Sequence, residues 1–401
     1  MGIKYRDNSI SGVYAGYDTV YQVILNNNVI WSGDRGDIAD WRYAEVDGKK
    51  VLFEYIGADP VNIAVPRDNG QTVVNNYTSG DTTAESNTPF YNNPNIISID
   101  LQQVPYVNSS MSNAFAYSSN LTSVKSICQS TTNMRGTFGS CIKFNYEVKL
   151  PSTVTDLTST FSYCTNFNSS IQIPDTITRV PYTFERCSSF NQNIQIPNSV
   201  TDLNGTFSYC SSFNQNVQIP DSVKMMQRTF YYCNNFNRNI KLGNSVNTLF
   251  QTFYNCSSLN QNIQIPNSVT NMSGTFRNCT NLNQNIQIPN RVTDMFGTFA
   301  HCSSLNQNIQ IPDSVTNMDD TFRNCNSLNG DIMILSSLVA NAARCFSNTS
   351  LPKNVYIPYA YENGRHTITF ISFKFAGYID SSGVSTGQDG VTVIDLNSLN
   401  N

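Results

Sequence analysis

The sequence predicts an α/β repeat solenoid, a stack of 23-residue units with a parallel β-sheet. The first observation is a row of cysteines spaced by 23 residues without a break. The second is that Thr-Phe precedes each cysteine, with the phenylalanine three positions upstream, and that an apolar residue followed by asparagine comes three positions downstream. A fixed period of this length is the signature of a solenoid, in which each unit buries its apolar face against its neighbours. The cysteines of the row are Cys141, Cys164, Cys187, Cys210, Cys233, Cys256, Cys279, Cys302 and Cys325.

Each unit is expected to contain one short strand and one return leg. Ile194-Gln195-Ile196-Pro197 alternates apolar and polar residues before a proline, which predicts a strand with isoleucines inward and glutamine outward. The return leg includes Val200 and Leu203 and is expected to be compact, helical or irregular. Phenylalanine and cysteine, three residues apart, are expected to share one face of a short helical turn.

The repeat resembles the BspA-like leucine-rich repeats, and within them the Phe-x-x-Cys, Phe/Leu-Asn-Gln subclass. The segment from Cys256 to Ile263 reads Cys-Ser-Ser-Leu-Asn-Gln-Asn-Ile, and Thr270-Asn271-Met272 leads into the next unit. Proteins of this kind occur on bacterial surfaces and in mobile elements, and most of them act in adhesion and recognition. The resemblance therefore implies a leucine-rich-repeat-like stack and raises the expectation of a binding function.

The flanks of the regular repeats divide the chain further. Residues 1-50 are expected to form an N-terminal β anchoring module, because two apolar runs surround Asn26-Asn27-Asn28 as in a hairpin. Residues 51-133 read as degenerate repeats and an N-terminal cap, with Ser118 where a cysteine would stand. Residues 134-340 form the regular solenoid, and residues 341-401 form a C-terminal cap and tail.

A second resemblance bears on context. Residues 10–31 resemble the short β modules of tailed-bacteriophage structural and tail proteins, which implies a virion protein. Met1 to Asp7 carry charges where a signal peptide needs an apolar core, so we expect no signal peptide and assembly in a host cytoplasm. The expected partners are other virion subunits, bound through the N-terminal module, and a host-surface glycan or protein. We also expect a homo-oligomer.

Composition excludes several classes of function. The net charge is −4 and no basic stripe is present, which argues against nucleic-acid binding. No window approaches 18 apolar residues, so we expect no membrane insertion. The eleven cysteines lack Cys-x-x-Cys spacing, and His301 and His366 lie far apart, so buried core thiols are favoured over a metal ladder. We predict no catalytic, cofactor or metal site and no enzymatic activity.

Binding is better supported by the sequence. The two positions before each ladder cysteine vary while their surroundings are fixed, and stacking places them in an exposed column rich in tyrosine and arginine. The structural alternative is that any exposed column must contain some residue and that tyrosine is abundant here. The candidate binding stripe is Tyr163, Arg186, Tyr209, Tyr231, Tyr232, Tyr254, Arg277, His301 and Arg323.

Two further columns are expected to be structural. One is the outward row that includes Gln195, Lys241 and Gln264, whose amides can hydrogen-bond along the stack. The other is the row of asparagines that includes Asn214 and Asn237, which are expected to bond backbone groups in the turns.

Three functions remain open on the sequence. The first is a bacteriophage virion surface protein, of tail or head fibre type, that recognises a host surface through the solenoid. The second is a purely structural virion subunit, such as a head-decoration or tail-adaptor protein. The third is a bacterial cell-surface adhesin.

Overall fold

The structure is a computed structural model of the 401-residue chain. It describes residues 90–101, 109–335, 341–342 and 344–349 in full, and elsewhere the strands named below. The chain divides into two compact units. Unit 1 comprises Met1–Asp156 and Tyr163–Phe167, and unit 2 comprises Leu157–Ser162 and Asn168–Asn401.

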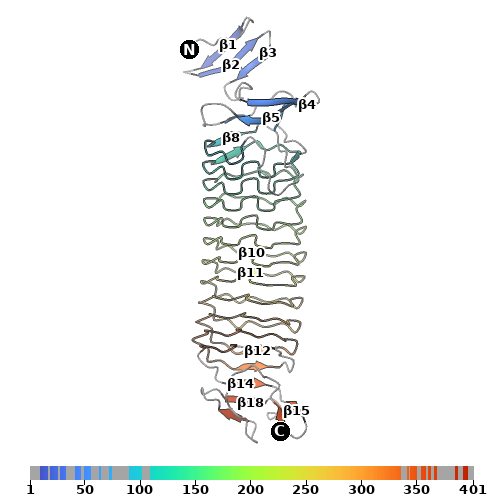
Figure 1. Ribbon diagram of the computed structural model, residues 1–401, viewed down its shortest axis with the longest axis vertical. Helices are drawn as coiled ribbons and strands as arrows, with labels where there is room; N and C mark the ends of the chain where they lie inside the picture. The colour runs from blue at the N-terminus through green and yellow to red at the C-terminus, as the bar shows by residue number, and fades with distance from the viewer. Residues whose placement is uncertain are drawn as a thin grey trace. The chain divides into compact units, whose positions relative to one another are not determined.

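The N-terminal part of unit 1 is built from short sheets (Figure 1). Strands β1 (Ile10–Gly16), β2 (Thr19–Leu25) and β3 (Asn28–Ser32) form an antiparallel meander. Leu25 of β2 pairs with Asn28 of β3, so the predicted hairpin is confirmed. Strands β4 (Trp41–Val46) and β5 (Lys49–Tyr55) pair antiparallel, and β7 (Thr72–Val74) joins β5 in parallel. Strand β5 thus crosses residue 50, where the sequence indicated a boundary.

The rest of unit 1 consists of coils whose offset is irregular at first and becomes 23 residues from Ser110 to Asn133 and Asp156. Strands β6 (Ile63–Ala64), β8 (Ser98–Asp100) and β9 (Ser123–Lys125) form a parallel sheet, in which Ile99 pairs with both Ile63 and Val124. Ser118 is fully buried, and its hydroxyl donates to the carbonyl of Phe90. A serine therefore occupies the cysteine position in this coil, as the sequence indicates.

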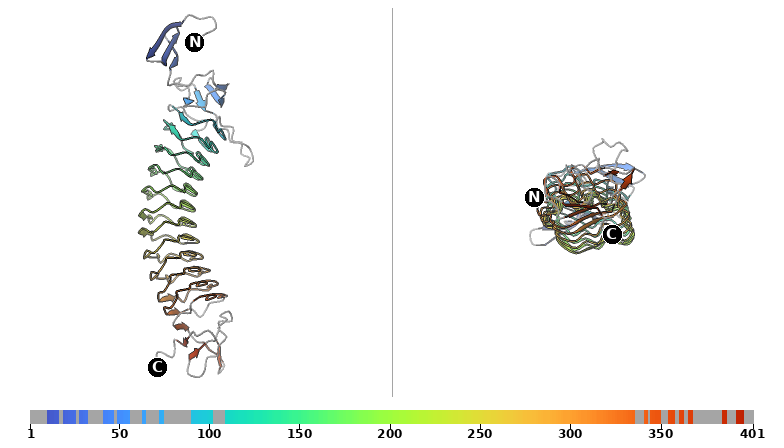
Figure 2. Two further views of the ribbon diagram at one scale, coloured as in Figure 1. Left: turned by 90° about the vertical axis from the view of Figure 1, so that its left-hand side faces the viewer. Right: turned by 90° about the horizontal axis from the view of Figure 1, so that it is seen from below.

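Unit 2 is a stack of coils joined by parallel strands, visible as separate layers in Figure 2. Strands β10 (Val217–Gln218) and β11 (Ile240–Lys241) pair in parallel, as do β12 (Ile309–Ile311) and β13 (Ile332–Ile334), each at an offset of 23 residues. The isoleucines of β12 are buried and Gln310 is exposed, as the alternation predicts. The parallel 23-residue solenoid is therefore confirmed.

The C-terminal segment continues this sheet. Strand β14 (Asn354–Ile357) pairs with β13, and β18 (Thr392–Asp395) pairs with β14 in parallel. Strand β17 (Val384–Thr386) closes a five-stranded sheet in the order β12-β13-β14-β18-β17. Strands β15 (Ala360–Glu362) and β16 (Arg365–Thr367) form a separate hairpin.

The return leg of each unit is not helical. The described residues contain no α-helix, so the expected helical turn under phenylalanine and cysteine is wrong, and the irregular alternative for the return leg is confirmed. In residues 203–213 the amides of Thr206, Ser208 and Cys210 bond the carbonyl three residues back. The alternate amides, such as those of Gly205 and Phe207, instead donate to the next coil at 2.8 and 2.9 Å. A helix would use these amides within its own segment, whereas alternate bonding satisfies both the turn and the neighbouring coil.

We call these segments turn ribbons. In unit 2 they are residues 180–190, 203–213, 226–236, 249–259, 272–282, 295–305 and 318–328. Each contains two residues with positive φ, as Gly205 and Tyr209 do at 61° and 60°. Glycine tolerates this backbone region best and asparagine next, while other side chains are strained by about 1–2 kcal/mol.

The core of unit 2 is a set of parallel columns. The phenylalanines of the Thr-Phe pairs stack from coil to coil, with ring centroids 5.4–5.7 Å apart from Phe161 to Phe346. The ladder cysteines are fully buried free thiols, which confirms their prediction as core residues. Each thiol also donates to a phenylalanine carbonyl of the preceding coil, as Cys233 Sγ does to Phe207 O at 3.1 Å.

The threonine of each Thr-Phe pair is a second buried donor. Thr229 Oγ1 lies 3.0 Å from Leu203 O on the preceding coil and 2.8 Å from Met226 O on its own coil. The same arrangement recurs from Thr183 to Thr321. The threonine is the same in every one of these units because its buried hydroxyl needs hydrogen-bond partners and links two coils.

The asparagine row forms the predicted ladder. Asn237 N donates to Asn214 Oδ1 at 3.0 Å, and Asn260 N donates to Asn237 Oδ1 at 2.9 Å. The hydrogen bonds expected between side chains along the outward glutamine row are not found. No hydrogen bond joins neighbouring members of that row in the described residues, and Gln287, one member, bonds Asn285 of its own coil instead.

Candidate binding face

The tyrosines of three consecutive turn ribbons stack on one another. The rings of Tyr209 and Tyr232 have centroids 4.8 Å apart and planes 19° apart. The ring of Tyr254 lies 4.9 Å from that of Tyr231 and 5.7 Å from that of Tyr232. Neighbouring rings cover one another's faces, so the ring edges and hydroxyl groups remain for contact with a ligand. All four tyrosines are half-buried, more covered than an exposed column would be.

Three arginines lie against this ring cluster. The Cζ atom of Arg186 is 4.2 Å from the ring centroid of Tyr209, and that of Arg277 is 6.0 Å from Tyr254. Between them, Arg228 Cζ lies 5.7 Å from the ring of Tyr231. Cation-π contacts of this kind contribute about 0.5–1 kcal/mol at exposed sites, so the guanidinium groups are held before any ligand arrives.

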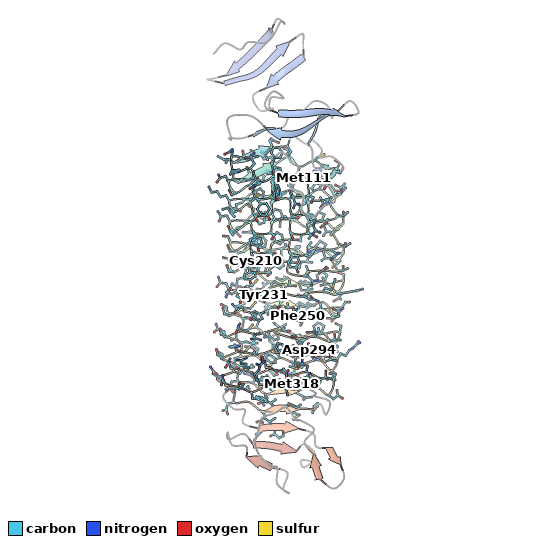
Figure 3. All side chains as sticks on the ribbon, viewed as in Figure 1. Met111, Cys210, Tyr231, Phe250, Asp294 and Met318 are labelled. Carbon is cyan, nitrogen blue, oxygen red and sulfur yellow. The ribbon has the colours of Figure 1, made fainter. Side chains whose placement is uncertain are left out.

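We call this cluster the aromatic-arginine face. Figure 3 labels two of its members, Tyr231 and Phe250, which lie on consecutive coils, with Arg228 Cζ 5.6 Å from the Phe250 ring. Its members are Arg186, Tyr209, Arg228, Tyr231, Tyr232, Phe250, Tyr254 and Arg277.

The electrostatics of the face favour donated hydrogen bonds. Burial raises the pKa of Tyr231 to about 12, and the neighbouring tyrosines add to the shift, so its phenol stays protonated. Glu185 is the one acidic residue in the five ribbons from 180 to 282. Burial raises the pKa of its carboxyl, against the opposing influences of Arg186 and the Ser162 hydroxyl. The face therefore presents guanidinium and phenol donors with little competing negative charge.

The predicted stripe is brought together only in part. Its members from Arg186 to Arg277 lie in the aromatic-arginine face, whereas Tyr163 is an exposed residue of unit 1. His301 Nδ1 lies 3.2 Å from Asn324 Nδ2, and Arg323 pairs with the buried Asp320 at 3.8 Å. Burial, and then the nearby Arg277 and Arg323, lower the pKa of His301.

Sequence reasoning missed Arg228 and Phe250. Both precede the two varying positions that defined the stripe, in a part of the ribbon where no contact with tyrosine is evident from the sequence. One signal was available for Arg228. Arg228 has positive φ, and the equivalent residues of three other ribbons are Gly205, Gly274 and Gly297. A large side chain at this position is therefore unusual, because the backbone conformation favours glycine.

Glycine at this position also makes room for a neighbouring ring. A Cβ atom on Gly205 would lie 2.4 Å from the ring of Tyr182, which is 40% exposed and leans across from the preceding coil. The face is thus bordered by a further tyrosine.

The family of the chain follows from its repeats. The family model described as "Mycoplasma protein of unknown function, DUF285" matches residues 81–195, 107–219, 155–266 and 247–356, together well over half of the chain. The chain belongs to the DUF285 family. No curated protein is significantly similar to it in sequence.

Two solved structures resemble this DUF285 member. One is a leucine rich cell surface protein from Faecalibacterium prausnitzii, with 19% identity over 79% of this chain and 93% of that chain and a TM-score of 0.51. The other is a leucine-rich repeat protein from Bacteroides ovatus, with 19% identity over 79% of this chain and 70% of that chain and a TM-score of 0.46. The first shows that the fold is that of a leucine-rich-repeat protein. These comparisons do not support the resemblance of residues 10–31 to bacteriophage proteins.

Among the described residues, no group of three or more His, Cys, Asp or Glu side chains could hold a metal ion. Within the same part of the chain, no helix has the length and apolar character to cross a bilayer.

Proposed function

We propose that this protein is a non-catalytic recognition protein that attaches to a surface through the aromatic-arginine face. One observation carries the proposal. Tyr209, Tyr232 and Arg186 occupy positive-φ positions, where the equivalent residues of other ribbons include Asn255 and Asn278. These side chains strain the backbone at consecutive coils and stack on one another, and a role in binding explains why such residues stand there.

The chemistry of the face suits recognition. Tyrosine and arginine dominate binding hot spots, because they offer large contact areas at a low cost in conformational entropy. Here the rings and guanidinium groups already hold one another in place, which lowers the cost of ordering them on binding.

Of the three functions left open by the sequence, we favour a bacterial cell-surface adhesin. The family description names mycoplasmas, and one structure with this fold is described as a cell surface protein. We further propose that residues 1-50, which include the β1-β2-β3 meander, hold the protein on its own surface.

Attachment of the purified full-length chain to a panel of bacterial and animal cells tests this proposal. The test variant changes Tyr209, Tyr232 and Arg277 to alanine, and the matched control changes three exposed residues of the strand row, Gln195, Lys241 and Gln264, to alanine. We expect the test variant to lose attachment and the control to keep it.

The folding of both variants needs a separate measurement, since the rings of the face are half-buried and stacked. We expect the test variant to lose about 2 kcal/mol of unfolding free energy through the broken ring contacts, and to remain folded. A folded test variant that attaches as well as the control would refute the proposal.

A further inference from the structure

Two arginines stand at the same position of turn ribbons that are separated by one ribbon. Arg277, Ala300 and Arg323 each lie two residues before the ladder cysteine of three consecutive ribbons. These ribbons are bonded directly to one another. Asn278 N donates to Ala300 O at 2.9 Å, and His301 N donates to Arg323 O at 2.7 Å. We call Arg277 and Arg323 the arginine pair.

The side chain of Arg277 reaches forward to the next ribbon. Gly297 lies on that ribbon, and a Cβ atom there would be 3.3 Å from Arg277 Nη1. The guanidinium group therefore lies against the Gly297 backbone, one step along the stack from its own ribbon. A side chain at position 297 would crowd it, so glycine leaves the room that the guanidinium occupies.

The side chain of Arg323 stays on its own ribbon, which follows that of Gly297. Arg323 Nη1 lies 3.8 Å from Oδ1 of Asp320, a residue that stands 23 positions after Gly297. The two ribbons are joined here, because Gly297 N donates to Asp319 O at 2.8 Å. Neighbouring coils of a parallel stack lie about 4.8 Å apart, so the charged ends of the arginine pair lie about one coil step apart along the stack.

The nearby carboxylate of Asp320 is taken up by another arginine. Asp320 is buried, and Arg344 donates to both of its oxygens, through Nε at 2.9 Å and Nη2 at 3.0 Å. The contact of Arg323 with Asp320, at 3.8 Å, is longer than a hydrogen bond. The positive charge of the arginine pair is therefore only weakly compensated by this aspartate.

The arginine pair also has donors to spare. In the described part of the chain, Nε of Arg277 and Nε of Arg323 are both buried without a hydrogen-bond partner. Buried polar groups in proteins are nearly always paired, so an unpaired donor at the same position of two ribbons indicates an acceptor that comes from outside the chain.

His301 supplies a third donor beside the arginine pair. Asn324 Nδ2 lies 3.2 Å from Nδ1 and 3.3 Å from Nε2 of this ring, so the amide donates to one ring nitrogen. A neutral imidazole that accepts at one nitrogen carries its proton on the other. Burial, and then the charges of Arg277 and Arg323, lower the pKa of His301, while Asp320 acts in the opposite direction. The ring therefore lies within electrostatic range of both guanidinium groups.

We propose that Arg277, His301 and Arg323 form a binding site for one phosphate group, either as inorganic phosphate or as a phosphate monoester. The inference goes beyond the proposed function, because it needs none of the stacked tyrosines. A phosphate dianion is tetrahedral, so its oxygens can accept from two guanidinium groups and an imidazole N–H on different sides. A carboxylate is planar and is matched by the fork of one guanidinium, which leaves the second arginine unused.

Titration of the full-length chain with inorganic phosphate, followed by NMR of the histidine rings, tests the site. The chain has two histidines, and His301→Asn identifies the signal of His301 by its loss. We expect phosphate to shift this signal and to raise the pKa of His301, because a bound dianion favours the protonated ring. Acetate at the same ionic strength is the control anion. Equal pKa values of His301 in phosphate and in acetate would overturn the inference.

Three variants test the arginines by calorimetry with inorganic phosphate. Arg277→Gln and Arg323→Gln should each weaken binding by about tenfold or more, the value of one hydrogen bond to a charged group. Arg291→Gln is the matched control, because Arg291 is exposed in the same unit and Ser268 and Ser314 occupy its position on neighbouring coils. Circular dichroism checks folding, and either arginine of the pair suffices for the test if the other variant is unstable. Binding by a folded Arg277→Gln or Arg323→Gln variant as tight as that of the control is incompatible with the site.

Glucose 6-phosphate separates the two sources of the phosphate group. Binding at least as tight as that of inorganic phosphate assigns the site to a monoester on a larger ligand, whereas binding of inorganic phosphate alone assigns it to the free ion. Binding of neither refutes the site. Because Arg323 lies outside the aromatic-arginine face, the phosphate affinity of Arg323→Gln tests this site by itself, whatever the triple variant shows about cell attachment.

Discussion

Replacement of one ladder thiol tests the hydrogen bond that links each coil to the one before it. Cys233 is fully buried, and its thiol donates to Phe207 O at 3.1 Å. Alanine removes that donor, at a net cost of about 0.5–1.5 kcal/mol. It also leaves a cavity of about 20 Å³, which adds about 0.5 kcal/mol. We therefore expect Cys233→Ala to lower the unfolding free energy by about 1–2 kcal/mol.

Serine should cost less than alanine at this position. A serine hydroxyl can donate to the same carbonyl, as buried Ser118 does to Phe90 O in unit 1. We expect Cys233→Ser to cost about 0.5 kcal/mol, the part that comes from the smaller volume. Urea unfolding followed by circular dichroism measures both values, with Cys128→Ser as a control expected to lie within about 0.5 kcal/mol of the parent. A serine variant less stable than the alanine variant would refute the thiol as a hydrogen-bond donor.

Two further predictions concern the reactivity of the cysteines and the titration of His301. Burial raises the pKa of Cys233 and of the other ladder thiols for which a shift is resolved, which makes these thiols unreactive. A thiol reagent applied to the native protein should therefore label only the half-buried Cys128 rapidly. The substitution Cys128→Ser should abolish that rapid reaction. The pKa of His301 is lower in the folded state than its ordinary value of about 6.5, so the unfolded chain binds the proton first and stability should fall as the pH drops below about 6.5. His301→Asn should show a smaller loss of stability between neutral and acidic pH in urea unfolding.

The sequence predicts best what repeats locally. The cysteine column and the Asn214 to Asn237 ladder could be derived because every unit repeats the same residue in the same turn. The helical turn could not be ruled out, because positive φ at Tyr209 follows from amide bonds to the next coil and not from any preference of tyrosine. Arg228 was missed for a similar reason. Its contact with Phe250 joins residues of consecutive coils, and residue types alone do not show which side chains lean across.

The exact offset of the coils has a consequence for how such a chain can lengthen. Residue n of one coil lies opposite residue n + 23 of the next, as in the pairing of Val217 with Ile240, so a whole unit can be duplicated or lost without a mismatch in the stack. A gain or loss of one unit inside the aromatic-arginine face would change which side chains meet there, whereas a gain or loss elsewhere in the stack would leave the face intact.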